Sequence, residues 1–118
     1  FVLLVEDDAS VRRTTTRMLE QLGHRVAVAD SAAEALHLFE RDGARFDLLI
    51  TDVVMPAMGG PELRRALAAL RPGLRTVFVS GWAPDVAVQR GGLEPGVLFL
   101  QKPFTLEELA RAMRQALA

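Results

Sequence analysis

The chain has 118 residues, of which half are hydrophobic, and it carries a formal net charge of −1 and no cysteine. This length suits one domain with a real core, and the near-neutral charge favours neither direct nucleic acid binding nor attraction to a membrane surface. Without cysteine the chain has no disulfides or thiolate metal sites, which fits a reducing cytoplasm. No apolar run approaches the roughly 20 residues of a transmembrane helix, so we expect no membrane insertion.

Five short apolar runs alternate with five amphipathic stretches, a pattern typical of a parallel α/β sheet. The runs lack polar alternation, as expected for strands that are covered on both sides. We predict a doubly wound five-stranded parallel sheet in the flavodoxin-like order 2-1-3-4-5, with helices on both faces. The sequence opens inside the first run without a methionine, so we expect the chain to be part of a longer protein. The predicted strands span residues 1–5, 25–29, 46–51, 75–79 and 97–100.

The helices are predicted from start signals and from apolar residues at helical spacing. Arginines of the first helix, Arg12, Arg13 and Arg17, are expected to lie on its solvated face. The residues of the last helix that we expect to be buried are Leu106, Leu109, Ala110, Met113 and Leu117. The fourth helix is predicted as the short stretch from Ala83 to Arg90. The start signals of the other four helices are, in chain order, Asp8 or Ala9, the capping box Ser31 to Glu34, the pair Gly60-Pro61 with proline at the first helical position, and the capping box Thr105 to Glu108.

Polar residues follow four of the predicted strands, at the point where each strand ends. They are Glu6 and Asp7 after the first strand, Asp52 after the third, Ser80 after the fourth and Lys102 after the fifth. Lys102 is also the only lysine in a chain with thirteen arginines. Ligands bind at the carboxyl ends of parallel strands, in this order between strands 1 and 3. We therefore expect these side chains to meet in one crevice.

The acids of this crevice indicate a magnesium site. Glu6, Asp7 and Asp8 stand in a row, and adjacent carboxylates repel one another unless a cation is present. Mg²⁺ prefers hard oxygen ligands and commonly takes one or two carboxylates. We expect Asp7 to be a direct ligand, because the topology directs it into the crevice, and Asp8 to cap the first helix.

Asp52, Lys102 and Ser80 together suit the transfer of a phosphoryl group. A carboxylate can act as the nucleophile that forms an aspartyl phosphate. An ammonium group beside it would stabilise the charge on the phosphoryl oxygens, and a hydroxyl could donate a hydrogen bond to one of them. Each residue alone has a simpler explanation as a turn aspartate, a surface lysine or a polar strand end. Their combination is what indicates a site.

These residues and their neighbours resemble the receiver domain of bacterial two-component response regulators over residues 1–118, essentially the whole chain. The finer likeness is to receivers attached to hybrid sensor histidine kinases. The resemblance implies one receiver domain that acts in phosphorelay signal transduction. The motifs that carry it are Glu6-Asp7, Asp52-Val53-Val54-Met55-Pro56, Gly59-Gly60-Pro61-Glu62-Leu63, Ser80-Gly81-Trp82-Ala83 and Lys102-Pro103-Phe104.

The resemblance implies a role for each residue of the crevice. Asp52 would be the phosphoacceptor, and Lys102 would contact the phosphoryl group. Asp7 and Asp52 would ligate Mg²⁺ directly, together with the main-chain carbonyl of Val54. Glu6 would act on the ion through a water molecule.

The resemblance also implies a switch and a partner. Ser80 matches the switch hydroxyl, and Phe99 matches the aromatic residue that rotates inward on activation, although phenylalanine lacks the hydroxyl of the tyrosine often found there. The phosphoryl donor would be a phosphohistidine of a histidine kinase, on the same or a separate chain. A histidine phosphotransfer protein is a further candidate partner. The domain would act in the cytoplasm, either free or tethered to a membrane-bound kinase.

Two other functions fit parts of the pattern. A phosphatase or phosphomutase that passes through an aspartyl phosphate would need a second acid two residues after the nucleophile, where this chain has Val54. A flavodoxin-like binding domain with a degenerate site would not retain the full set of acids and the lysine. We therefore expect a signalling module, not a turnover enzyme, that catalyses only its own phosphorylation and dephosphorylation.

Overall fold

A five-stranded parallel sheet runs through the computed structural model, which describes residues 1–94 and 97–118. The order of the sheet is β2-β1-β3-β4-β5, and each neighbouring pair of strands is parallel. The predicted order 2-1-3-4-5 is therefore confirmed. The strands are β1 (Val2–Val5), β2 (Val26–Ala29), β3 (Leu48–Asp52), β4 (Arg75–Ser80) and β5 (Phe99–Gln101).

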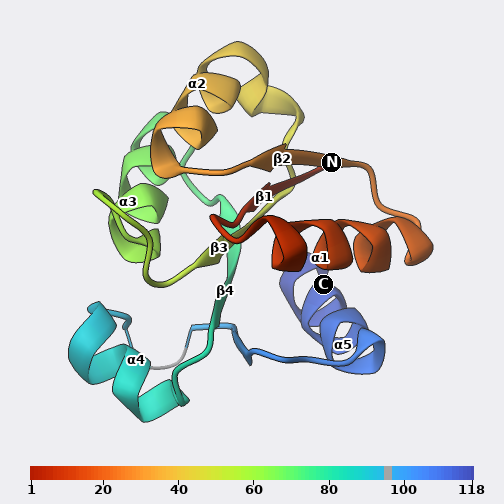
Figure 1. Cartoon of the computed structure of the whole chain (residues 1–118). Helices are drawn as coiled ribbons and strands as arrows, with labels where there is room; N and C mark the ends of the chain where they lie inside the picture. Colours follow the sequence, from red (N-terminus) through yellow and green to blue (C-terminus); the bar gives the residue numbers. More distant parts are fainter. Residues whose placement is uncertain (95–96) are drawn as a thin grey trace.

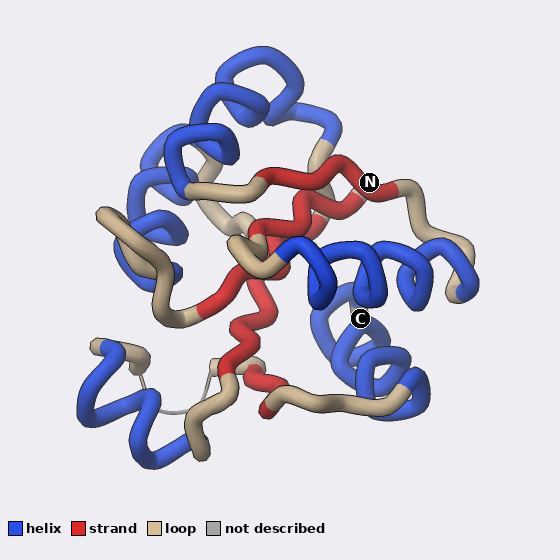
Figure 2. The backbone as a smooth tube through the Cα atoms, in the orientation of Figure 1, coloured by secondary structure: helices blue, strands red, loops and turns tan. Residues whose placement is uncertain are grey.

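Helices cover both faces of the sheet, as predicted. They are α1 (Ala9–Gln21), α2 (Ala32–Asp42), α3 (Gly60–Leu70), α4 (Pro84–Gly91) and α5 (Leu106–Leu117), with a 3-10 turn, η1 (Gly43–Arg45), after α2. The helices α1 and α5 lie on one face, and α2, α3 and α4 lie on the other (Figure 1). Figure 2 shows the strands in the middle of the molecule with the helices around them. Within the described ranges, no helix is both long and apolar enough to cross a membrane.

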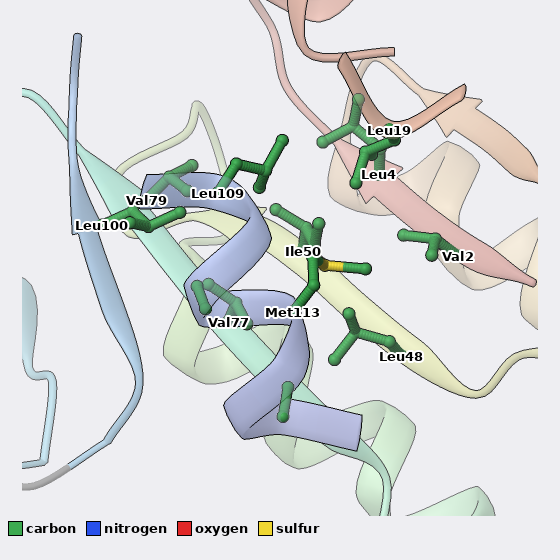
Figure 3. Close-up of a cluster of buried hydrophobic side chains, with 12 residues drawn as sticks. Val2, Leu4, Leu19, Leu48, Ile50, Val77, Val79, Leu100, Leu109 and Met113 are labelled. Atoms are coloured by element: carbon green, nitrogen blue, oxygen red, sulfur yellow. The ribbon is translucent and has the colours of Figure 1, made fainter. Parts of the chain in front are cut away.

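Strand side chains enter buried layers on both faces of the sheet, which explains the lack of polar alternation along the strands. Leu4 and Ile50 belong to the layer under α1 and α5, where Leu19, Leu109 and Met113 pack with them (Figure 3). The other face of the same strands packs against α2 and α3 in a second layer. A smaller group of buried residues, the α4 cluster, consists of Val53, Phe78, Ala87 and Leu93.

One of the two predicted capping boxes forms completely. The Thr105 hydroxyl accepts the Glu108 N–H at 3.1 Å, and the Glu108 carboxylate accepts the Thr105 N–H at 2.9 Å. At the start of α2 only half of the box is present: Ser31 accepts the Glu34 N–H at 3.1 Å. The Glu34 carboxylate instead accepts the N–H of Asp30, one residue earlier. The predicted capping box was wrong at α2 because the backbone N–H within reach of the Glu34 carboxylate belongs to Asp30 and not to Ser31.

The buried face of α5 differs in part from the predicted stripe. Leu109 and Met113 are buried as expected, but Leu106 is 37% exposed. Ala112 and Ala116, which were not in the stripe, are buried instead. Alanine is small, so it lets the backbone of α5 come close to the strands beneath it. Which residues of α5 are buried therefore depends on how the helix docks on the sheet, and not on which side chains are largest.

Every strand boundary lies within two residues of its prediction, and two differences, at α3 and at β5, bear on the local structure. Helix α3 begins at Gly60 with Gly59 as its N-cap, so Pro61 is the second helical residue and not the first. Strand β5 begins at Phe99, two residues later than predicted. It is an edge strand that pairs only with β4, which leaves it fewer partners to extend the ladder.

Ala57, in the loop before α3, offers a test of backbone strain. Its φ of 69° is the only positive value for a non-glycine residue in the described part of the chain. This conformation costs an alanine roughly 1 kcal/mol, because Cβ approaches a carbonyl oxygen. We expect Ala57→Gly to raise the free energy of unfolding in urea by about 0.5–1 kcal/mol. Ala66→Gly, in the middle of α3, should lower it by about 1 kcal/mol; a loss in both variants would contradict the prediction.

Candidate functional site

The carboxyl ends of the strands surround a cavity of about 350 Å³. This position is the one expected from the strand order, since β1 and β3 are neighbours in the middle of the sheet. Every site residue predicted from the sequence lines the cavity except Phe99. The lining residues are Glu6, Asp7, Asp8, Asp52, Val54, Ser80, Gly81, Trp82 and Lys102.

The ammonium group of Lys102 joins two of the acids. Its Nζ donates to Glu6 Oε1 at 2.9 Å and to Asp52 Oδ1 at 2.8 Å. The backbone of the lysine is held as well, because its N–H donates to the Ser80 carbonyl at 2.7 Å and the following bond to Pro103 is cis. The expectation that these residues meet in one crevice is correct.

Glu6 is anchored through all of its polar groups. Its N–H donates to the Ala29 carbonyl at 3.1 Å, and its own carbonyl accepts from Arg12 Nη1 at 2.8 Å. The second carboxylate oxygen, Oε2, accepts the Asp8 N–H at 3.1 Å, while Oε1 accepts from Lys102. This complete set of partners is what allows Glu6 to be only 1% exposed.

Three carboxylates come together in an arrangement that fits a hard cation. One ligand oxygen each from Glu6, Asp7 and Asp52 lies within 4.8 Å of the other two. Glu6 and Asp52 are buried and Asp7 is exposed, so the cluster can be reached from solvent. An all-oxygen set of this kind suits Mg²⁺, which usually keeps several waters. Asp8 lies outside the cluster and caps α1 through its carboxylate, as predicted.

Glu6, Asp52 and Lys102 shift one another's pKa values. Burial raises the pKa of Asp52 to about 8, and the neighbouring Glu6 carboxylate adds to the effect, against the opposing pull of Lys102. Burial acts in the same direction on Glu6, but hydrogen bonds with Asp52 and Lys102 outweigh it and lower its pKa. Burial would lower the pKa of Lys102, yet its bonds to both carboxylates raise it. Without a bound cation, the pair of acids therefore retains a proton, mainly on Asp52.

Ser80 and two hydrophobic residues complete the wall of the cavity. Ser80 is 6% exposed, and its Oγ accepts the N–H of Trp82 at 3.0 Å. This bond uses the oxygen as an acceptor and leaves the hydroxyl hydrogen available for donation. Val54, two residues after Asp52, is 52% exposed at the rim.

Phe99 lies away from the cavity. It is half-buried and packs against the α4 cluster together with Trp82 and Val97. Since Trp82 lines the cavity and also contacts this cluster, it connects Ser80 to the region of Phe99.

Arg12 lies near the site, although nothing in the sequence indicated it. Arg12 was expected on the solvated face of α1, but its guanidinium donates to the Glu6 carbonyl at 2.8 Å. That prediction was wrong, because the partner is six residues earlier and lies beyond the end of the helix. Helical periodicity gives no indication of such a contact.

The N-terminus of α3 packs tightly on the backbone that carries Asp52. The Gly60 N–H donates to the Val53 carbonyl at 2.8 Å. A Cβ atom at Gly60 would overlap the Asp52 carbonyl oxygen, so only glycine permits this approach.

Comparison with known proteins identifies the family. The family described as the response regulator receiver domain matches residues 2–114. The chain belongs to this family. The receiver domain is 40% identical over 116 residues to sensor kinase CckA of Brucella abortus (strain 2308) and 34% identical over 116 residues to the response regulator receiver protein CpdR of the same organism. Both alignments cover 98% of this chain, but they span 12% of CckA and 95% of CpdR.

Solved structures show the same likeness. The receiver domain of the hybrid histidine kinase CckA superposes with a TM-score of 0.82 at 34% identity, over 99% of this chain and 98% of that one. The chemotaxis protein CheY4 of Vibrio cholerae has a TM-score of 0.85 at 29% identity, over 98% of this chain and 96% of that one. The predicted resemblance to receiver domains, including those of hybrid kinases, is confirmed.

The close approach of Gly60 predicts a large effect of a single methyl group. Gly60→Ala should lower the free energy of unfolding by about 1–3 kcal/mol, because the receiver domain must move the backbone at Asp52 to admit Cβ. Urea denaturation would measure the change. Gly81→Ala is the matched control: Gly81 also borders the cavity but has open space around its Cβ position. Equal losses in the two variants would contradict the argument.

The raised pKa of Asp52 predicts a pH-dependent stability in the metal-free protein. Its folded-state pKa, about 8, lies above the ordinary value of 3.8, so the stability that it contributes is present at low pH and is lost as the pH rises through 8. Asp52→Asn should remove this decline. We expect the variant to be more stable than the wild type by about 1–3 kcal/mol at pH 8 and by less at pH 5. Urea denaturation with a chelator at both pH values would measure it; a constant difference would argue against the shift.

Proposed function

We propose that this receiver domain takes a phosphoryl group from a phosphohistidine onto Asp52 in an Mg²⁺-dependent reaction. The observation that carries the proposal is the shared ammonium group of Lys102, bonded at once to Asp52 and to Glu6 beside the acid cluster. A nucleophilic carboxylate, a fixed cation and hard oxygen ligands are the groups that phosphoryl transfer requires.

The acid cluster is the proposed binding site for Mg²⁺. Asp7 and Asp52 would hold the ion directly, with the main-chain carbonyl of Val54, which lies at the rim of the cavity. Glu6 would act through a water molecule, in keeping with the commitment of both its carboxylate oxygens to Lys102 and Asp8. When bound, the ion supplies positive charge that offsets the charge of the carboxylates and of the phosphoryl oxygens.

Asp52 and Lys102 carry out the transfer of the phosphoryl group. The Asp52 carboxylate attacks phosphorus while the phosphorus–nitrogen bond to the donor histidine breaks and the imidazole leaves. Lys102 remains oriented by Glu6 during this step, so its ammonium group can pair with the phosphoryl oxygens at no cost in reorganisation. Binding a cation would also displace the proton that the raised pKa of Asp52 retains, which leaves the carboxylate ready to attack.

The proposed switch begins at Ser80. Its hydroxyl hydrogen could donate to a phosphoryl oxygen on Asp52, and the movement would pull on Trp82, whose N–H is bonded to Ser80 Oγ. Phe99 packs in the same region as Trp82 and would follow. Phe99 has no hydroxyl, so its response must come from packing alone.

The wider role is proposed by likeness to the relatives. The donor would be a histidine kinase, on the same or a separate chain, with a histidine phosphotransfer protein as a further partner, and the site of action would be the cytoplasm. The sensor kinase CckA, of which this chain spans 12%, suggests a receiver within a longer kinase. The phosphatase or phosphomutase alternative is less well supported, because Val54 offers no carboxylate to the cavity.

Phosphorylation of Asp52 can be tested by mass. A small acyl phosphate with Mg²⁺ should add one phosphate to the wild type and none to Asp52→Asn, since the amide is not a nucleophile. Asp47→Asn is a suitable control, because Asp47 is exposed and lies outside the cavity. Intact-mass spectrometry would count the phosphates. Undiminished labelling of Asp52→Asn would place the acceptor elsewhere and defeat the proposal, whereas free phosphate released in many turnovers would favour the phosphatase.

The rim of the cavity predicts a long-lived aspartyl phosphate. Hydrolysis needs a water in line with phosphorus, but Val54 and Trp82 present no carboxylate or amide to orient one. Val54→Glu or Val54→Asn should therefore speed the loss of phosphate about tenfold, which corresponds to about 1.4 kcal/mol of barrier. Trp82→Ala should also speed it by opening the approach. Decay would be followed by phosphate release after removal of the donor; wild-type decay within seconds would contradict this prediction.

A further inference from the structure

Arg12 links the first turn of α1 to the loop that carries the acids. Its Nη1 donates to the Glu6 carbonyl at 2.8 Å, and the side chain is partly buried. Arg13, the next residue, carries the same charge on the same helix but is exposed. Arg12 and Arg13 thus carry the same charge but differ in their contacts and in their burial.

The position of Arg12 is not explained by the energetics of the helix. It is the fourth residue of α1, close to the amino end, where the helix dipole disfavours a cation. An N-cap is already supplied by Asp8. A residue that opposes its local helix preference commonly serves a contact outside the helix.

Arg12 makes this contact to the loop that carries the three acids. Glu6, Asp7 and Asp8 are three consecutive acids whose charges repel, and they connect the buried strand β1 to helix α1. The Glu6 carbonyl would be left unsatisfied without Arg12, because Glu6 is only 1% exposed to water. The loop could then rotate, and Asp7 would swing away from Asp52.

We propose that Arg12 is a positioning residue that holds the loop from Glu6 to Asp8 in the geometry in which its carboxylates bind Mg²⁺, an inference that rests on the metal site proposed above. Mg²⁺ tolerates little departure from octahedral geometry. A loop that is correctly placed only part of the time lowers the apparent affinity by the fraction of competent molecules.

The proposed role of Arg12 and simple electrostatics predict opposite changes in Mg²⁺ affinity when Arg12 is replaced. Loss of a positive charge near a cation site should strengthen Mg²⁺ binding by Coulomb attraction. Loss of the hydrogen bond to Glu6 should weaken it by disordering the loop. We expect the second effect to win for Arg12→Gln, with an apparent affinity roughly five- to tenfold lower than in the wild type.

The experiment measures the melting temperature and the Trp82 fluorescence over a series of Mg²⁺ concentrations at constant ionic strength. Arg12→Met removes the donor altogether, and Arg12→Gln replaces the guanidinium by a shorter amide that does not reach as far towards the Glu6 carbonyl, so one variant remains usable if the other does not fold. Arg13→Gln is the matched control for charge and should bind Mg²⁺ as tightly as the wild type or slightly more tightly. Asp7→Ala shows the result of losing a direct ligand.

The outcomes separate the inference from the proposed function. Weaker Mg²⁺ binding in the Arg12 variants, with unchanged or tighter binding in Arg13→Gln, supports the positioning role. Wild-type or tighter binding in the Arg12 variants overturns it, even if their metal-free melting temperature falls, since that is what a purely structural contact would give. Absence of any Mg²⁺ response in the wild type would instead defeat the proposed metal site, and the inference with it.

Discussion

The ammonium group of Lys102 lies between two buried carboxylates, at 2.9 Å from Glu6 and 2.8 Å from Asp52. Each acid has lost most of its hydration, and the two repel each other, so the shared ammonium group lowers the cost of ionising the pair, although the pKa of Asp52 stays raised. The same contact fixes where the positive charge stands before any ligand arrives. A lysine suits this place better than the arginines that dominate the chain, because its charge is compact and its three donors can turn between partners.

The backbone determines that this contact can form. Glu6 and Lys102 are 96 residues apart, and Asp52 and Lys102 are 50 apart, yet the carboxyl ends of β1, β3 and β5 lie at one edge of the sheet. The Lys102 N–H is bonded to the Ser80 carbonyl, which ties the end of β5 to the end of β4. The close packing of α3 through Gly60 fixes the other side, behind Asp52. The reactive groups are thus held by the scaffold and not by flexible loops.

The region around α4 is built differently. Ala87 is the only buried residue that the helix contributes, and the residue after Asp52, Val53, belongs to the same cluster. Gly91, at the end of α4, packs directly against the Val53 side chain, with Trp82 nearby. Elements held by few buried contacts are the ones that open or shift most easily. A rigid site next to a lightly packed helix suits the switch proposed above, in which a change at Ser80 is passed through Trp82 to Phe99.

The sequence by itself determined the strands and the acids and lysine at their ends, because these follow from local rules, and the order of the sheet followed from the general winding of five βα units. Apolar runs define strands, and residues such as Asp52 and Lys102 stand at strand ends whatever surrounds them. Only the tertiary structure decided the contacts that depend on how elements dock. Arg12 reaches back to Glu6 beyond the end of its helix, and the face of α5 buries Ala112 where the apolar pattern favoured Leu106. Periodicity describes one element at a time, whereas these choices depend on the distance and angle between two.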